Sequence, residues 1–223
     1  MKLSVIIPAY NEIDTIAEVL DRVRAVDIEK EIIVIDDCST DGTREFLRTQ
    51  ADIELVENAR NLGKGASIRE VLEHVTGDIV VIQDADLEYD PADFPKLIAP
   101  IVEGKADMVY GTRFAGVRPK MRFANYVANG LFALVASLLY RRRITDEATC
   151  YKAFSTEVLK GIGLRCHRFE FCPEVTSRLL KRGYRYTEVP INYHARTHAQ
   201  GKKITWLDGI ECLWTLLKYR FIG

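Results

Sequence analysis

The sequence predicts a doubly wound α/β fold, built on a mainly parallel sheet, for a chain of 223 residues. Short apolar runs rich in β-branched residues alternate with helical segments of about ten residues, which is typical of parallel sheets. Polar clusters follow four successive predicted strands. No internal repeat, low-complexity segment or linker interrupts the chain. We therefore expect one continuous domain over residues 1–223.

The first half of the chain carries the regular alternation. Predicted strands cover residues 3–8, 31–35, 53–56 and 107–111, with a further strand that starts at residue 79. Predicted helices cover residues 13–26, 43–49, 66–75 and 93–102.

The pattern changes after residue 111. It predicts a long apolar helix within 118–143, a strand at 148–154, a helix at 173–181 and a strand at 184–193, where Pro190 indicates an edge position. A final amphipathic helix is predicted at 205–221. One face of this helix carries Leu207, Ile210, Leu213, Trp214, Leu217 and Phe221. That face could lie in a membrane interface or pack on the sheet, and both alternatives stay open.

Composition narrows the classes of protein. A net charge of -1 offers no general basic surface, so we expect no nucleic-acid partner. Five cysteines without a CxxC pair argue against disulfides and structural zinc, and favour a reducing cytoplasm. The short apolar run at the N-terminus does not predict a signal peptide, and no segment approaches the roughly 20 apolar residues of a membrane span. We expect a cytoplasmic protein that is soluble or lies at the inner face of the membrane.

The strand that starts at residue 79 ends in alternating carboxylates. Asp84, Asp86 and Glu88 would point the same way if the strand continued that far. Carboxylates that converge repel one another unless a cation joins them, and Mg²⁺ and Mn²⁺ prefer oxygen ligands. This predicts a metal site. The alternative is an acidic loop before Pro91 in which aspartates cap the next helix.

Three other polar clusters also follow predicted strands, at residues 10–12, 36–37 and 60–64. Ligands of doubly wound sheets bind outside the carboxyl ends of the strands. We therefore expect the four clusters to meet in one crevice that contains both acids and bases.

Other motifs are weaker. Gly63-Lys64-Gly65 fits neither a P-loop nor GxGxxG, which argues against an ATPase or a nicotinamide dehydrogenase; Lys64 either reaches a nucleotide or starts a helix. No Ser or Cys stands in a nucleophile elbow. Arg113, Arg196, Lys202 and Lys203 could neutralise a diphosphate or remain solvated.

Several stretches together resemble the family 2 glycosyltransferases with the GT-A fold, most closely polyprenyl-phosphate (dolichol-phosphate) mannosyl- and glucosyltransferases. They are residues 5–12, 36–43, 61–65, 84–86, 111–114, 169–171, Arg196 and 201–203. The resemblance covers almost the whole chain. It implies a nucleotide-sugar-binding half at 1–113 and an acceptor-binding half at 114–223.

The resemblance also implies roles for matching residues. Base and ribose of the donor, GDP-mannose or UDP-glucose, would be held by Pro8, Tyr10, Glu12 and Asp37. Mg²⁺ or Mn²⁺ and the diphosphate would be held by Asp84, Asp86 and Glu88, and we include Lys64 and Ala85 among the donor-binding residues. Phosphates of donor or acceptor would be contacted by Arg113, Arg196 and Lys202.

The expected reaction is inverting, metal-dependent transfer of a hexose, mannose or glucose, to a polyprenyl phosphate. Mg²⁺ held by Asp86, together with Arg196 and Lys202, would stabilise the charge that develops on the leaving diphosphate. An anionic phosphate acceptor hardly needs a general base. A hydroxyl acceptor does, and Asp146 is the residue proposed for it, unless Asp146 only caps or pairs with the arginine run at 141–143.

Two alternatives remain: transfer to a hydroxyl of a glycan or small molecule, and binding of a sugar nucleotide without turnover. The sequence also departs from the family pattern twice. Cys38 stands where the family often has Gly, which suggests a less demanding backbone there. The chain ends at Gly223 without the membrane helices that many relatives carry, so we expect none.

Overall fold

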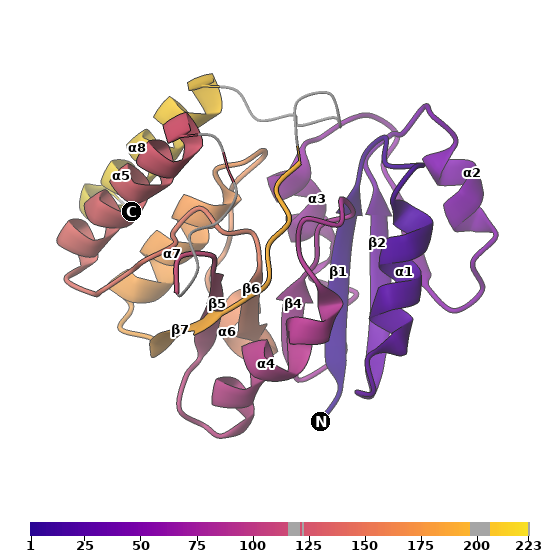
Figure 1. The fold of residues 1–223 in the computed structure, drawn as a ribbon, viewed down its shortest axis with the longest axis horizontal. Helices are drawn as coiled ribbons and strands as arrows, with labels where there is room; N and C mark the ends of the chain where they lie inside the picture. Colours follow the sequence, from indigo (N-terminus) through magenta and orange to yellow (C-terminus); the bar gives the residue numbers. More distant parts are fainter. Residues whose placement is uncertain (116–120, 122, 197–205, 223) are drawn as a thin grey trace.

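A seven-stranded sheet forms the centre of the molecule in the computed structural model (Figure 1). The structure describes all residues except 116–120, 122, 197–205 and 223, and the side chain of Trp206. The sheet has the strand order β3-β2-β1-β4-β6-β5-β7. The strands are β1 (Leu3–Ala9), β2 (Lys30–Asp36), β3 (Glu54–Glu57), β4 (Ile79–Ile82), β5 (Met108–Thr112), β6 (Lys152–Ser155) and β7 (Tyr186–Pro190).

The sheet is mainly parallel, as predicted. β1 pairs in parallel with β2 and β4, β2 with β3, and β5 with β7. Only β6 runs antiparallel to its neighbours among the described strands. The prediction that Pro190 marks an edge strand is confirmed, because β7 ends the sheet and a proline cannot donate to a further strand.

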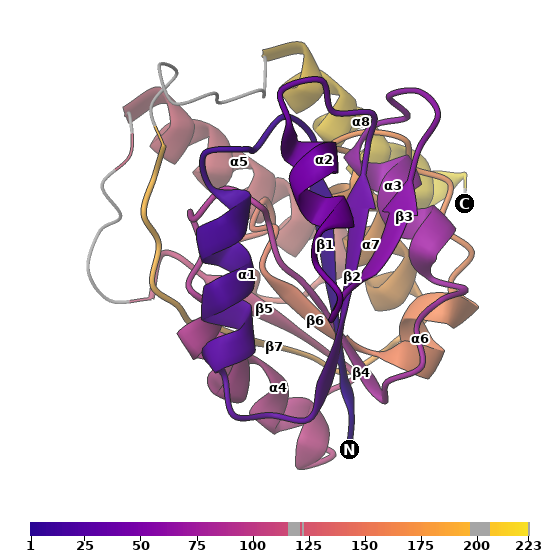
Figure 2. The same cartoon turned by 90° about the vertical axis from the view of Figure 1, so that its right-hand side faces the viewer.

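Helices cover both faces of the sheet (Figure 2). The helices are α1 (Ile16–Ala25), α2 (Thr43–Arg48), α3 (Lys64–Val71), α4 (Phe94–Val102), α5 (Phe123–Tyr140), α6 (Thr156–Gly161), α7 (Phe171–Lys181) and α8 (Trp206–Phe221). Alternate residues of β1 explain the layers: Val5 and Ile7 pack with α1 and α4, whereas Ile6 packs with α3, α6 and α7.

α5 and α8 lie side by side beyond the second face of the sheet (Figures 1 and 2). They bury a small cluster of Ala136, Tyr140, Ile144 and Leu216. Tyr140 ties the two helices, since its hydroxyl donates to the carbonyl of Leu216 at 2.9 Å. Within the described residues, α5 is long and apolar enough to cross a membrane by length and composition alone, and 17% of that 18-residue window is buried.

The apolar face predicted for the last helix does not pack on the sheet. Leu207, Ile210, Trp214 and Phe221 are exposed, while the helix packs inward through Leu216 and Tyr219. The alternative in which this apolar face packs on the sheet was therefore wrong. The periodicity identified residues that share a face of α8. However, α8 packs against the helices α5 and α7, and they contact a narrower stripe of it.

Candidate active site

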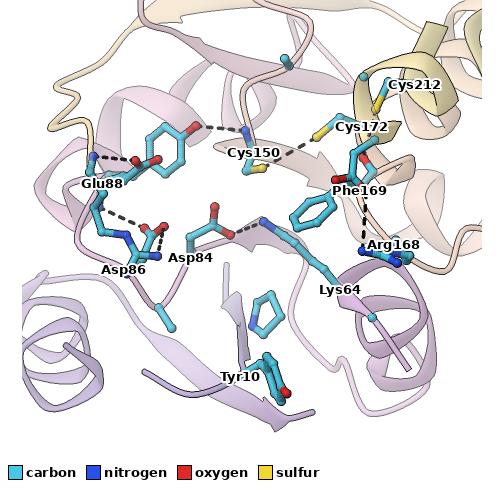
Figure 3. Close-up of a pocket in the computed structure, with 18 of the residues that line it drawn as sticks. Tyr10, Lys64, Asp84, Asp86, Glu88, Cys150, Arg168, Phe169, Cys172 and Cys212 are labelled. Atoms are coloured by element: carbon cyan, nitrogen blue, oxygen red, sulfur yellow. Dashed lines mark hydrogen bonds and ion pairs between the residues drawn. The ribbon is translucent and has the colours of Figure 1, made fainter. Parts of the chain in front are cut away.

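A cavity of about 1140 Å³ lies at the carboxyl ends of β1, β2 and β4. The structure thus brings together the polar clusters that were expected to meet there. Its walls include these residues proposed from sequence: Pro8, Tyr10, Glu12, Asp37, Lys64, Asp84, Ala85, Asp86, Glu88, Arg113 and Arg196. The cavity continues to a second wall formed by α5, α7 and α8. Figure 3 shows Cys172 of α7 and Cys212 of α8 on this wall.

Lys64 is the first residue of α3 and reaches into the cavity. Its ammonium donates to the carboxylate of Asp84 (Figure 3), and both side chains are 16% exposed. Burial lowers the pKa of Lys64 and the charge of Asp84 raises it, with a net upward shift, so the ammonium stays charged at neutral pH. Lys64 thus starts the helix, as one alternative predicted, and it also lies in the cavity wall; its contact with a nucleotide stays a prediction.

Arg196, from the segment after β7, crosses the cavity to two carboxylates. One Nη donates to Asp86 Oδ2 at 2.9 Å, and the other donates to Glu12 Oε2 at 2.9 Å. Burial, together with the charges of Asp84 and Glu88, nevertheless raises the pKa of Asp86 to about 7. The charge of Arg196 lowers the pKa of Asp86 but does not offset burial and the two neighbouring carboxylates.

Glu88 binds the segment that follows β7 and does not point the same way as Asp84 and Asp86. Its carboxylate accepts the Tyr193 hydroxyl at 3.1 Å and the backbone N–H of Arg196 at 2.8 Å. β4 ends at Ile82, and Leu87 turns the chain with φ +61°. The expected alternation over 84, 86 and 88 was therefore wrong, because it required an extended strand. In the described part of the chain, no three His, Cys, Asp or Glu side chains are placed to hold a metal together.

Asp84 and Asp86 still fit a hard divalent cation. Both offer carboxylate oxygens at the cavity wall, and hard divalent cations prefer oxygen ligands. Mg²⁺ commonly binds through one or two carboxylates while substrate phosphates and water supply the other ligands. The donor set therefore suits a metal held jointly with a diphosphate, rather than by the protein alone.

Asp37 organises the loop that precedes α3. Its two carboxylate oxygens accept the backbone N–H groups of Leu62 and Gly63, each at 2.8 Å, and Asn58 donates to it as well. Asp37 lines the cavity, but its three hydrogen bonds hold the loop. A direct role of Asp37 in donor binding stays a proposal.

The glycine loop packs against protein backbone. A Cβ on Gly63 would lie 2.5 Å from the carbonyl oxygen of His167, and one on Gly65 would lie 2.8 Å from that of Arg168. The amides of Gly65 and Ala66 donate to those same carbonyls. The glycines thus permit close approach of two segments, and these two amides are not free to bind phosphate.

Cys38 contradicts the expectation of a less demanding backbone. Its φ is +66°, in the left-handed region where a Cβ is unfavourable. The turn is held by the neighbouring residues, since Ser39 N donates to Asp36 and Ser39 Oγ accepts from Asn11 N. The backbone at position 38 therefore has a conformation that suits glycine, although the residue there is a cysteine.

Arg113 and Asp146 form a buried pair. Arg113 Nε donates to Asp146 Oδ2 and its NH2 group donates to Oδ1, both at 2.7 Å, and the side chains are 7% and 0% exposed. The backbone N–H of Arg113 donates to Asp146 as well. This geometry favours the pairing alternative for Asp146, although the partner is Arg113 rather than the arginine run. Asp146 is not among the residues that line the cavity.

Sequence reasoning missed much of the far wall of the cavity. α5 contributes Asn125, Asn129 and Phe132, and the segment before β6 contributes Glu147, whose pKa burial raises to about 6. The apolar periodicity of α5 gave no sign that its small and polar positions face a cavity. Lys202 and Lys203, proposed as phosphate contacts, lie outside the described residues.

Comparisons with known proteins agree with this geometry. Residues 4–163 match the model of the family described as glycosyl transferase family 2. Glycosyltransferase AglJ of Haloferax volcanii is 33% identical over 194 residues, covering 86% of this chain and 63% of its own length. Dolichol-phosphate mannosyltransferase of Pyrococcus furiosus is 29% identical, over 98% of this chain and 64% of its own. The chain thus spans less than two thirds of the length of these relatives.

Solved structures share the fold. Glucosyl-3-phosphoglycerate synthase from Mycobacterium tuberculosis, in complex with Mn²⁺ and UDP-glucose, matches with a TM-score of 0.77 and 25% identity. The match covers 100% of this chain and 80% of the synthase chain. Because the family model matches more than half of the chain and the fold agrees, the chain belongs to glycosyl transferase family 2.

Proposed function

We propose that the protein transfers a hexose, mannose or glucose, from a nucleoside-diphosphate sugar to a polyprenyl phosphate, with inversion and with a divalent cation. The observation that carries this proposal is a single cavity with two different walls. One wall carries Asp84, Asp86, Lys64 and Arg196 at the strand ends, and the other is formed by α5 and α8, two helices with exposed apolar faces.

The charged wall supports a nucleoside-diphosphate donor. Alternating carboxylates and cations suit a diphosphate bound together with a divalent ion. Pro8, Tyr10 and Asp37, at the ends of β1 and β2, are the residues proposed for the base and ribose. The M. tuberculosis synthase was solved with Mn²⁺ and UDP-glucose, which supports the same class of donor.

In the proposed reaction, residues of this chain position the two substrates and counter the charge of the leaving group. The divalent cation, held by Asp84 and Asp86, would stabilise negative charge on the nucleoside diphosphate as the bond to the sugar breaks. Arg196 would add a fixed positive charge on the same side. A phosphate acceptor is already anionic, so the chain needs to align it opposite the leaving group without removing a proton.

Exposed apolar residues of α5 and α8 support a lipid acceptor. Large side chains stand in water along both helices, including Phe123 and Leu138, each about 70% exposed, and Trp214 at 58%. Apolar side chains spread along two adjacent helices are typical of a surface that another apolar phase covers. The Pyrococcus furiosus relative, named a dolichol-phosphate mannosyltransferase, and a Micrococcus luteus undecaprenyl-phosphate mannosyltransferase that is 29% identical support the same acceptor class.

Basic residues flank this apolar surface. α5 is followed by Arg141, Arg142 and Arg143, which are exposed, and the last turn of α8 carries Lys218 and Arg220. Arg220 lies over the ring of Tyr140, so the two basic ends are neighbours. This arrangement suits anionic lipid headgroups and supports a peripheral position at the cytoplasmic face of the membrane.

A transfer assay tests the proposal. The protein is incubated with radiolabelled GDP-mannose or UDP-glucose and Mn²⁺, with and without undecaprenyl phosphate, and the label is partitioned into organic solvent. Acceptor-dependent label in the organic phase is the expected result. Label in a water-soluble product would support transfer to a hydroxyl instead, and nucleotide binding without transfer or hydrolysis would support a binding protein.

A further inference from the structure

Two cations of this chain occupy the carboxylates proposed for the metal. Lys64 is paired with Asp84, and Arg196 is paired with Asp86 and Glu12. The partners come from distant parts of the sequence, separated by 20 residues for the first pair and by 110 for the Arg196–Asp86 pair. All five side chains line the cavity and are at most 16% exposed.

These pairs differ from a permanent buried ion pair in the same protein. Arg113 and Asp146 share two bonds that use both carboxylate oxygens, at 7% and 0% exposure. Lys64 contacts one oxygen of Asp84, and one oxygen of Asp86 accepts Arg196 while the other accepts the backbone of Glu88. Arg196 also donates to both oxygens of Glu12, but its contact with Asp86 and that of Lys64 with Asp84 each use one carboxylate oxygen. Asp84 and Asp86 line the cavity, whereas Asp146 does not.

A divalent ion that binds Asp84 and Asp86 must compete with both cations. If it arrived alone, Lys64 would lose Asp84 and Arg196 would keep only Glu12, while both cations remain largely out of water, which is costly for a charged group. A nucleoside diphosphate arriving alone would meet the carboxylates of Asp84 and Asp86. When both arrive together, the diphosphate oxygens can take Lys64 and one side of the Arg196 guanidinium, the metal can take Asp84 and Asp86, and Glu12 can keep the other side of Arg196.

We propose that Lys64 and Arg196 exchange partners when donor and metal bind, moving from the carboxylates to the diphosphate. The divalent cation and the nucleoside diphosphate then each bind tightly only in the presence of the other. This inference rests on the proposed donor class, but not on the acceptor. Lys64 and Arg196 are positioning residues that couple the two binding events.

Binding of Mn²⁺, measured by electron paramagnetic resonance of the free ion, tests the exchange. For the native chain, 1 mM UDP or GDP is expected to tighten Mn²⁺ binding by at least about tenfold, within the usual range of coupling between two sites. For Lys64→Met, Mn²⁺ alone is expected to bind about tenfold more tightly than to the native chain, because its competitor is gone, and the nucleotide should add less. Arg196→Met should act in the same direction.

Lys96→Met is the matched control. Lys96 lies on α4 and its ammonium is 2.7 Å from Asp93, so this variant removes the same charge from a lysine–aspartate pair outside the cavity. It should bind Mn²⁺ like the native chain. Thermal unfolding establishes that each variant is folded before titration.

Two results overturn the exchange: Mn²⁺ affinity without nucleotide that is equal in Lys64→Met, Lys96→Met and the native chain, or Mn²⁺ and nucleotide that bind independently. Either result can occur while the protein still transfers sugar to undecaprenyl phosphate. Conversely, coupled binding without any such transfer would remove the acceptor assignment and leave the exchange in place. The partner exchange and the acceptor assignment can therefore be disproved independently of each other.

Discussion

The chemistry proposed for the cavity depends on single residues, and Asp86 is the most consequential of them. It lies between a cation and two further carboxylates, and burial together with the charges of Asp84 and Glu88 raises its pKa to about 7. Such a position is typical of binding sites, where charge is arranged for a partner rather than for the stability of the fold.

Replacing Asp86 by Ala should reduce sugar transfer at least about a hundredfold, because a carboxylate that anchors the metal and diphosphate is lost. The melting temperature should not fall, since a buried and poorly compensated carboxylate is removed. Initial rates of label transfer and thermal unfolding measure the two effects. Unchanged turnover in a folded Asp86→Ala protein would falsify its place in the donor site.

A second prediction at the scale of single residues concerns Cys38. Because its φ is +66°, Cys38→Gly should stabilise the fold by about 1 kcal/mol, as the left-handed conformation no longer carries a Cβ. Cys38→Ala is the control, since it removes the thiol and keeps the Cβ, and it should leave stability nearly unchanged. Urea unfolding measures both. Equal stability of the two variants would contradict the strain argument.

At the scale of elements, α5 and α8 carry the surface that we propose contacts the membrane. Each helix buries a narrow stripe and leaves large apolar side chains in water. The sheet itself does not need them there, because its own two faces are already covered by α1 and α4 on one side and by α3, α6 and α7 on the other. The exposed faces of α5 and α8 therefore point to a partner outside the described chain.

Introducing charge into this surface should weaken membrane binding without unfolding the protein. Trp214→Glu and Leu138→Glu are each expected to lower the partition onto vesicles with anionic lipid by about tenfold, because apolar burial is lost and a negative charge is added. Vesicle sedimentation measures the partition.

Val102→Glu is the matched control for these two substitutions. Val102 is 55% exposed on α4, close to the 58% of Trp214, but lies away from α5 and α8. Its partition should equal that of the native chain. If all three variants bind vesicles equally, the surface formed by α5 and α8 is not the membrane contact.

At the scale of the whole molecule, Glu31 ties the amino ends of the strands together, opposite the cavity. Its carboxylate accepts the Lys2 ammonium, the Ser4 hydroxyl at 2.5 Å and the backbone N–H of Thr76. Burial alone would raise the pKa of Glu31, but the hydrogen bonds from these partners lower it to about 2. The ionised carboxylate therefore contributes to the stability of the central sheet.

The sign of the pH dependence follows from this shift. Because the folded pKa lies below the ordinary value of 4.5, the stabilisation is complete above pH 4.5 and is lost as the pH falls towards 2. Glu31→Gln should lose about 2 kcal/mol at pH 7 and less at pH 3. Glu18→Gln, in an exposed pair with Arg22, should change stability by at most about 0.5 kcal/mol. Urea unfolding at both pH values checks this, and an equal loss at pH 3 and pH 7 would contradict the assignment.

Local sequence predicted most of the architecture. Runs such as Ile79–Ile82 are apolar and β-branched, so they identified the strands, and the polar residues after them identified the edge where the cavity lies. α6 was missed because its six residues show no helical period and, unlike α2, it is not preceded by a turn cluster such as residues 36–42. The end of β4 could not be predicted, because periodicity does not show that the strand stops at Ile82 or that Leu87 turns the chain.

The sequence by itself determined the fold class, the family and the strand ends that carry the acids. It could not determine which cation meets which carboxylate, since Lys64 reaches Asp84, and Arg196 reaches Asp86, only after the chain has folded. Nor could it determine whether the apolar face of α8 points inward or outward. Periodicity is a property of neighbouring residues, whereas pairing and orientation depend on which distant elements pack together.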